Sequence, residues 1–268
     1  MTAGNYAPVN GLDLYYEVCG TGQPLILLHG GLGVIGMFEQ LLPGLAETRQ
    51  VIAVELQAHG HTADIERPLS FESMADDIAA LIKYLGLDGA DILGYSLGGG
   101  VALQAAIRHP EVVRKLVIVS APDKSDGWYP ENRAGMASMN AEAAKTWIGS
   151  PMHQAYISVA PKPEDWTALA DKLGQLLRQD YDWADAVATI KAPIMIVVGD
   201  ADGVRTAHAV QFFELLGGGK ADAGWDGSGM SNARLAILPA TTHYNILGSM
   251  LLAPIVTPFL DAPMPETR

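Results

Sequence analysis

Short apolar runs, separated by polar turns, recur along most of this chain and predict strands. They lie at 12–18, 24–28, 50–56, 91–94, 115–120, 193–199 and 234–238. Two of them, PLILL and PIMIVVG, are apolar throughout. Such runs are expected where a strand is buried on both faces of a parallel sheet.

Apolar residues at three- and four-residue spacing predict helices between these strands. In the clearest example, 70–87, Ser70 is placed to cap the first turn and Gly86 to end the helix. Further helices are predicted at 97–108, 205–216 and 246–260, the last with a bend at Pro254. Strands that alternate with helices predict an α/β fold with a mostly parallel, doubly wound sheet.

Residues 122–190 interrupt this alternation, because they read as helical pieces without strands. We expect them to form a helical lid over the carboxyl edge of the sheet, where open α/β sheets bind ligands. The predicted core is then 1–121 together with 191–268.

The predicted lid is rich in aromatic residues, since it holds four of the five tryptophans. Packing between lid and core accounts for most such rings, but Trp128, Tyr129 and Trp147 are candidate substrate contacts. A second irregular stretch, 217–231, is too glycine-rich for a helix or strand and predicts a loosely ordered loop.

Composition narrows the classes of function. Apolar residues make up 49% of the 268 positions, enough for a sizeable core in a single domain. Acidic residues outnumber basic ones 30 to 17, for a net charge of -13, and no basic run is present. Nucleic acid is therefore not an expected partner, because its phosphates are bound by clusters of Lys and Arg.

Cysteine usage and hydropathy bear on metal binding, membrane association and location. Cys19 is the single cysteine, so neither an internal disulfide nor a CxxC metal pattern is available. No apolar stretch approaches the roughly 20 residues that cross a bilayer, and no secretory signal is visible. We expect a cytoplasmic protein that binds no membrane, no metal and no cofactor. Its oligomeric state stays open, with a homodimer as one possibility.

The segment Gly94-Tyr95-Ser96-Leu97-Gly98 carries the main chemical signal. It fits G-x-S-x-G between a predicted strand and a predicted helix, the setting of a nucleophile elbow. Small glycines allow the sharp, strained turn that projects the Ser96 hydroxyl into a cleft. A phosphate-binding loop would need a Lys and different glycine spacing, which are absent here.

A second glycine-rich turn, His29-Gly30-Gly31, follows the strand PLILL. We expect the N–H of Gly31 to pair with the N–H of Leu97 as an oxyanion hole. His29 is expected to be structural.

These motifs, together with Glu55–Thr62, Gly199–Asp202 and Thr242-His243, resemble the α/β-hydrolase superfamily over nearly the whole chain outside 122–190. In order and spacing they are similar to its lid-bearing esterases, enol-lactonases and carbon–carbon bond hydrolases. The turn at 55–62 departs from the family sequence, because Glu55 and Gln57 stand where an Asp and an Arg are usual. We interpret this as structural variation.

A serine nucleophile needs a base and an acid that orients the base. Of seven histidines, only His243 lies just beyond the last predicted strand, as the order Ser…Asp…His requires. The resemblance implies Asp202, after the strand PIMIVVG, as the acid. Asp200, Asp123 and Asp226 remain alternatives.

A serine at this position predicts an acyl-enzyme, whereas dehalogenases and epoxide hydrolases of this fold use an Asp. The first hypothesis is a hydrolase of a carboxylic ester or lactone with a small apolar substrate. A second is a carbon–carbon bond hydrolase of aromatic degradation, whose anionic substrate would need an arginine such as Arg133 or Arg178. A third is a small-ligand receptor that keeps the fold without turnover.

Overall fold

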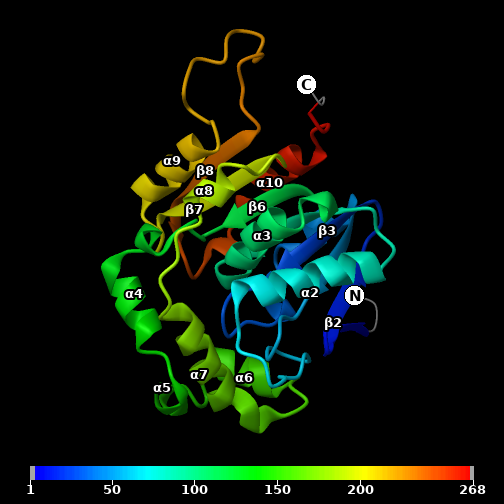
Figure 1. Ribbon diagram of the computed structural model, residues 1–268, viewed down its shortest axis with the longest axis vertical. Coiled ribbons are helices and arrows are strands. Elements are labelled where there is room, and N and C mark those ends of the chain that lie inside the picture. The colour runs from blue at the N-terminus through cyan, green and yellow to red at the C-terminus, as the bar shows by residue number, and fades with distance from the viewer. Residues whose placement is uncertain (1–3, 266–268) are drawn as a thin grey trace.

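A computed structural model describes residues 4–265 of the chain (Figure 1). Within these residues, eight strands form one sheet in the spatial order β1-β2-β4-β3-β5-β6-β7-β8. The strands are β1 Asn5–Val9, β2 Leu12–Cys19, β3 Gln23–Leu28, β4 Arg49–Val54, β5 Ala90–Tyr95, β6 Val113–Val119, β7 Ile194–Ala201 and β8 Ala233–Thr242. From β4 to β8 every neighbouring pair is parallel, while β2 runs antiparallel to both β1 and β4.

Helices cover both faces of this sheet. They are α1 Leu42–Ala46, α2 Phe71–Tyr84, α3 Leu97–Arg108, α4 Pro130–Ala137, α5 Ala141–Thr146, α6 Pro151–Ile157, α7 Trp166–Leu177, α8 Ala184–Val187, α9 Thr206–Leu215 and α10 Leu252–Asp261. Alternate residues of each central strand point to opposite faces. Ile26 and Leu28 of β3 belong to the core formed with α2 and α3, and Leu25 and Leu27 to the core on the side of α1 and α10.

The predicted fold class is confirmed, because the sheet is mostly parallel and helices flank it on both sides. All seven predicted strands are present, and the predicted cap of α2 is made by the Ser70 hydroxyl, which accepts the N–H of Ser73. The first strand, β1, was not predicted. Its residues alternate between exposed and buried over only five positions at the sheet edge, which is a weak signal.

The prediction of one bent helix over 246–260 is wrong. A short 3-10 turn, Ile246–Gly248, is followed by α10, which begins at Leu252. Pro254 lies in the first turn of α10, where its missing N–H needs no helical partner, so no bend forms there.

Helices α4 to α8 lie between β6 and β7 in the chain, and α4 to α7 cluster to one side of the sheet (Figure 1). Their place between two core strands agrees with the predicted helical insertion, whereas the bounds 122–190 stay a prediction. Between α9 and β8 the glycine-rich segment has no helix or strand and projects from the body of the molecule (Figure 1).

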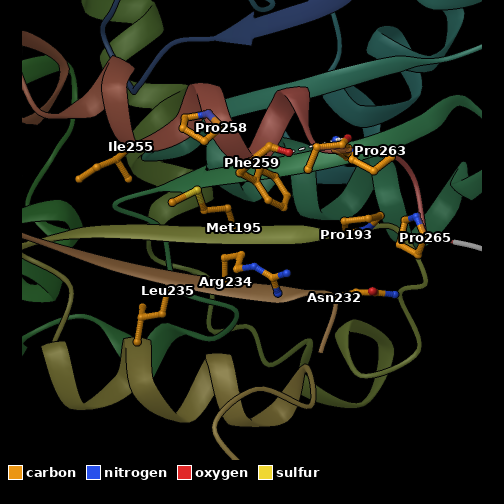
Figure 2. Close-up of a pocket in the computed structure, with 12 residues that line it drawn as sticks. Pro193, Met195, Asn232, Arg234, Leu235, Ile255, Pro258, Phe259, Pro263 and Pro265 are labelled. Atoms are coloured by element: carbon orange, nitrogen blue, oxygen red, sulfur yellow. Dashed lines mark hydrogen bonds between the residues drawn. The ribbon is translucent and has the colours of Figure 1, made fainter. Parts of the chain in front are cut away.

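A pocket of about 360 Å³ lies at the amino ends of β6, β7 and β8 (Figure 2). The buried Lys115 ammonium donates there to the carbonyls of Phe259, Leu260 and Ala262, at the end of α10. Cations stabilise helix C-termini, so this lysine fastens α10 to the sheet. The pocket is at the opposite edge from Ser96, which follows the carboxyl end of β5.

Candidate active site

Ser96 occupies a sharp turn between β5 and α3. Its backbone angles, φ 52° and ψ -115°, are strained for a residue with a side chain. A Cβ at Gly94 would lie 2.1 Å from the carbonyl oxygen of Gly98, and a Cβ at Gly98 would lie 2.4 Å from that of Leu28. Both glycines are therefore needed for strand and helix to approach this closely.

The turn brings Ser96 to a histidine far along the chain. His243, directly after β8, has Nε2 3.1 Å from the Ser96 Oγ. Its Nδ1 is 3.0 Å from Oδ1 of Asp202, which directly follows β7. The sheet thus gathers a hydroxyl, an imidazole and a carboxylate in a line of two hydrogen bonds, the arrangement of a catalytic triad.

The Asp202 side chain is buried and accepts four hydrogen bonds. Oδ1 accepts from His243 and from the N–H of Val204, and Oδ2 accepts from the N–H of Gly199 and from the Ser120 hydroxyl. Burial by itself would raise the pKa of this carboxyl. The hydrogen bonds from His243, Ser120 and Gly199 outweigh it and hold the pKa below its ordinary value, so the group is ionised.

The three alternative acids contact other groups. Asp200 is exposed and accepts the N–H groups of Ala240 and Thr241, which hold its pKa below the ordinary value. Asp123 is buried with Oδ1 2.7 Å from Nε2 of His208, on α9. Asp226 accepts the N–H of Ser228 within the projecting loop.

Gly31 and Leu97 both line the same cavity as Ser96. The N–H of Leu97 belongs to the first turn of α3, where amides have no helical acceptor and the helix dipole favours negative charge. Among residues 4–265, no backbone acceptor is recorded for the amide of Gly31 or of Leu97. Both donors remain available to an oxyanion.

Two buried histidines hold the Gly31 loop in place. His29 Nε2 accepts the N–H of Leu56, and His59 Nε2 accepts the N–H of Leu32, at 3.1 and 3.2 Å. Burial lowers the pKa of His29 to about 3 and that of His59 to about 4, so both rings are neutral. Among residues 4–265, the hydrogen-bond partners of His29 are backbone groups, and its structural role stays a prediction.

The turn at 55–62, whose sequence departs from the family pattern, makes contacts that stabilise the fold. The buried Glu55 carboxylate accepts the N–H of Ile35 and both the N–H and Nδ1 of His61. It therefore joins this turn to the loop after β3.

A cavity of about 830 Å³ opens above Ser96, and its walls are mainly apolar. Trp128 and Trp147, the candidate substrate contacts, line it, and the Trp128 ring meets the His243 ring edge to face at 5.4 Å. Tyr129 is half exposed and is not among the described residues that line the cavity. The apolar lining includes Met136, Met139, Leu173, Leu176 and Leu177.

Both arginines of the cavity wall are already engaged. The Arg133 guanidinium bonds to the carboxylates of Asp126 and Asp180. Arg178 donates to the carbonyls of Ala137 and Met139, near the end of α4.

Two side chains that hydrogen-bond to these residues were missed from the sequence. The Tyr95 hydroxyl donates to the carbonyl of His243 at 2.7 Å, and the Ser120 hydroxyl donates to Asp202 at 2.5 Å. Tyr95 lies inside the G-x-S-x-G motif, so its closeness to the site was visible. Ser120 follows β6 without any motif, and its partner lies 82 positions away.

Comparison with known proteins bears on the fold. A model of the α/β hydrolase fold matches residues 23–149. A pimeloyl-(acyl-carrier protein) methyl ester esterase of Neisseria meningitidis serogroup B (strain H44/76) is 43% identical over 117 residues, 43% of each chain. The chain aligns with less than half the length of the curated relatives that it matches at 42–44% identity.

Solved structures extend the likeness to the full fold. A meta-cleavage product hydrolase from Pseudomonas fluorescens IP01 has a TM-score of 0.72 at 20% identity, covering 96% of this chain and 97% of that one. An enol-lactonase from Burkholderia xenovorans LB400 has a TM-score of 0.71 at 19% identity, covering 96% of this chain and 100% of that one. Among the described residues, no helix is long and apolar enough to span a membrane.

Proposed function

We propose that this chain is a serine hydrolase of the α/β-hydrolase superfamily, whose fold it has. Its substrate is a carboxylic ester or lactone of a small apolar molecule, cleaved through an acyl-enzyme. The observation that carries the proposal is the continuous hydrogen-bonded line from Ser96 through His243 to Asp202. We propose residues 122–190 as the lid over this site.

The geometry supports the following sequence of steps. His243 Nε2 takes the Ser96 proton as Oγ attacks the substrate carbonyl carbon. Asp202 keeps the other ring nitrogen protonated and stabilises the imidazolium. The N–H groups of Gly31 and Leu97 stabilise the oxyanion, an effect of about 2.7–4 kcal/mol per donor.

His243 then protonates the leaving oxygen as the C–O bond breaks. The alcohol of an ester departs, whereas that of a lactone stays attached to the acyl group on Ser96. Water attacks the acyl carbon while His243 takes its proton, and the acid is released as the Ser96 hydroxyl re-forms. No cofactor enters these steps.

The cavity favours a neutral substrate over the anionic one of the carbon–carbon hydrolase hypothesis. Arg133 is neutralised by two carboxylates, and Arg178 is committed to backbone carbonyls. A substrate carboxylate would therefore have to displace existing partners or stay unpaired against apolar walls, which is costly. Relatives named as a methyl ester esterase and an enol-lactonase support the ester or lactone reading.

A fluorophosphonate probe tests the nucleophile. Wild type should become labelled and Ser96→Ala should not, because only an activated serine reacts. Failure of wild type to label, or labelling of Ser96→Ala, would refute the proposal.

A panel of p-nitrophenyl esters, aliphatic esters and lactones then tests the substrate class. Turnover below about ten times background on every one, in a protein that labels, would favour the carbon–carbon hydrolase. Binding without any labelling would favour the receptor. A cytoplasmic location and a homodimeric state rest on the sequence alone and stay part of the proposal.

A further inference from the structure

Ser120, the residue that follows β6, is fully buried beside the acid of the proposed triad. Its hydroxyl donates to Oδ2 of Asp202 at 2.5 Å. We propose that Ser120 is a positioning residue, which holds the Asp202 carboxylate so that Oδ1 faces His243. This inference rests on the proposed function.

The backbone of Ser120 indicates that its side chain matters. With φ at 53°, it adopts the left-handed conformation that favours glycine. A side chain kept at such a position costs conformational free energy, which is often tolerated where the side chain has a function.

Ser120 also lies much farther from Asp202 in the chain than the backbone donors to the carboxylate. Gly199, on β7, and Val204 lie within three positions of Asp202 in the chain, so their N–H groups hold the carboxylate through its own strand and turn. Ser120 reaches Asp202 from the neighbouring strand end. Its hydroxyl therefore links the carboxylate itself to the end of β6.

The same strand end also holds the nucleophile. The N–H of Ser96 donates to the carbonyl of Val119 at 2.9 Å, and the N–H of Ser120 donates to the carbonyl of Val197 on β7. Residues 119 and 120 thus bond to the nucleophile's backbone on one side and to the acid's carboxylate on the other. The end of β6 sets the spacing between Ser96 and Asp202.

The charge of the carboxylate is affected as well. The Ser120 bond is one of the interactions that keep the pKa of Asp202 below its ordinary value despite burial. The other titratable groups that face Asp202 and His243 are Tyr95, on β5, and Tyr244, whose ring lies 5.5 Å from that of His243. A hydroxyl that donates to Asp202 disperses charge that would otherwise act on the imidazolium.

The test compares wild type with Ser120→Ala and Ser120→Gly. Both remove the hydroxyl, and the glycine variant also relieves the positive φ, so it should fold at least as well as wild type. The readouts are kcat/KM for p-nitrophenyl butyrate across pH, the rate of fluorophosphonate labelling, and thermal unfolding.

We expect kcat/KM to fall about tenfold in both variants, as for loss of a hydrogen bond to a charged group. The midpoint of the acid limb should move up by about half a pH unit, because the undispersed carboxylate favours the imidazolium. Thr62→Val is the matched control. It removes a buried hydroxyl that donates to the carbonyl of Glu55, and should leave that midpoint unchanged.

Activity within twofold of wild type would overturn the inference. So would a fall in activity with an unmoved or lowered midpoint, which would assign Ser120 a merely structural role. If wild type itself neither labels nor turns over esters, the proposed function fails instead, so the two failures are distinct.

Discussion

Replacing Asp202 by asparagine tests the proposed acid with almost no change of shape. All four groups that contact the carboxylate are donors: the hydroxyl of Ser120, the N–H groups of Gly199 and Val204, and Nδ1 of His243. An asparagine amide turns one of the two oxygens into an NH₂ group, which must then face two donors. Either orientation of the amide leaves a buried backbone N–H without an acceptor.

The two orientations differ in chemistry. With the NH₂ toward Gly199, that N–H loses its acceptor, while His243 still donates to the amide oxygen. With the NH₂ toward His243, the N–H of Val204 loses its acceptor and the imidazole must accept at Nδ1. Its proton then sits on Nε2, facing Ser96, so the ring can no longer act as the base.

The expected magnitudes follow from this geometry. One orphaned buried N–H costs about 1–3 kcal/mol of stability, which lowers the melting temperature by roughly 2–4 °C per kcal/mol for a chain of this size. An imidazole held in the wrong tautomer lowers kcat by about 10⁴. We expect kcat/KM for p-nitrophenyl butyrate to fall by about 10³–10⁴ in Asp202→Asn, since both orientations contribute.

Two matched variants complete the experiment. Asp200→Asn changes an exposed carboxylate two positions away, and Asp123→Asn changes the buried alternative that faces His208. Neither should lower kcat/KM more than about tenfold, because neither contacts the His243 imidazole. A loss below tenfold in Asp202→Asn, or a larger loss in Asp123→Asn, would refute Asp202 as the acid.

Three further predictions follow from other parts of the structure. Burial holds the pKa of His29 near 3 and that of His59 near 4, so below about pH 6.5 the unfolded chain binds protons that the folded chain excludes. The melting temperature should therefore fall as the pH drops below about 6.5, and it should fall less steeply in His59→Asn than in wild type. Equal slopes in the two proteins would count against this. Gly98→Ala should lower the free energy of unfolding in urea by about 3 kcal/mol or more, because its Cβ would meet the backbone of Leu28. Gly135→Ala, in open space on α4, should raise that free energy by about 0.5–1 kcal/mol. Similar effects at both sites would contradict these contacts. Because Arg133 is already paired, kcat/KM for p-nitrophenyl butyrate should exceed that for mono-p-nitrophenyl succinate by about tenfold or more, and equal values would show that the arginine is available.

The sheet was predictable because its central strands are apolar on both faces, a pattern that few other structures produce. Ser96 was recognisable for a related reason: the elbow constrains Gly94 and Gly98 as well, so the chemistry leaves a local signature. His243 and Asp202 needed chain order and the family resemblance, because each follows a strand without a motif of its own.

What the sequence did not reveal depends on contacts between distant segments. Ser120 and Tyr95 hydrogen-bond to partners 82 and 148 positions away, and no local periodicity encodes such pairs. The placement of Tyr129 outside the cavity and the pairing of Arg133 depend on how short helices pack. The break before α10 was missed because the apolar pattern runs on past the turn, while the effect of Pro254 depends on its position within the helix.

The projecting segment between α9 and β8 has a practical consequence. Strand β8 is held by its pairing with β7, from Ile194 opposite Ala233 to Ala201 opposite Thr242, so the location of His243 is set by the sheet. The length of the preceding segment is thereby uncoupled from the chemistry. A peptide epitope or a fluorescent reporter could be grafted beside the fully exposed Trp225, and turnover should be preserved.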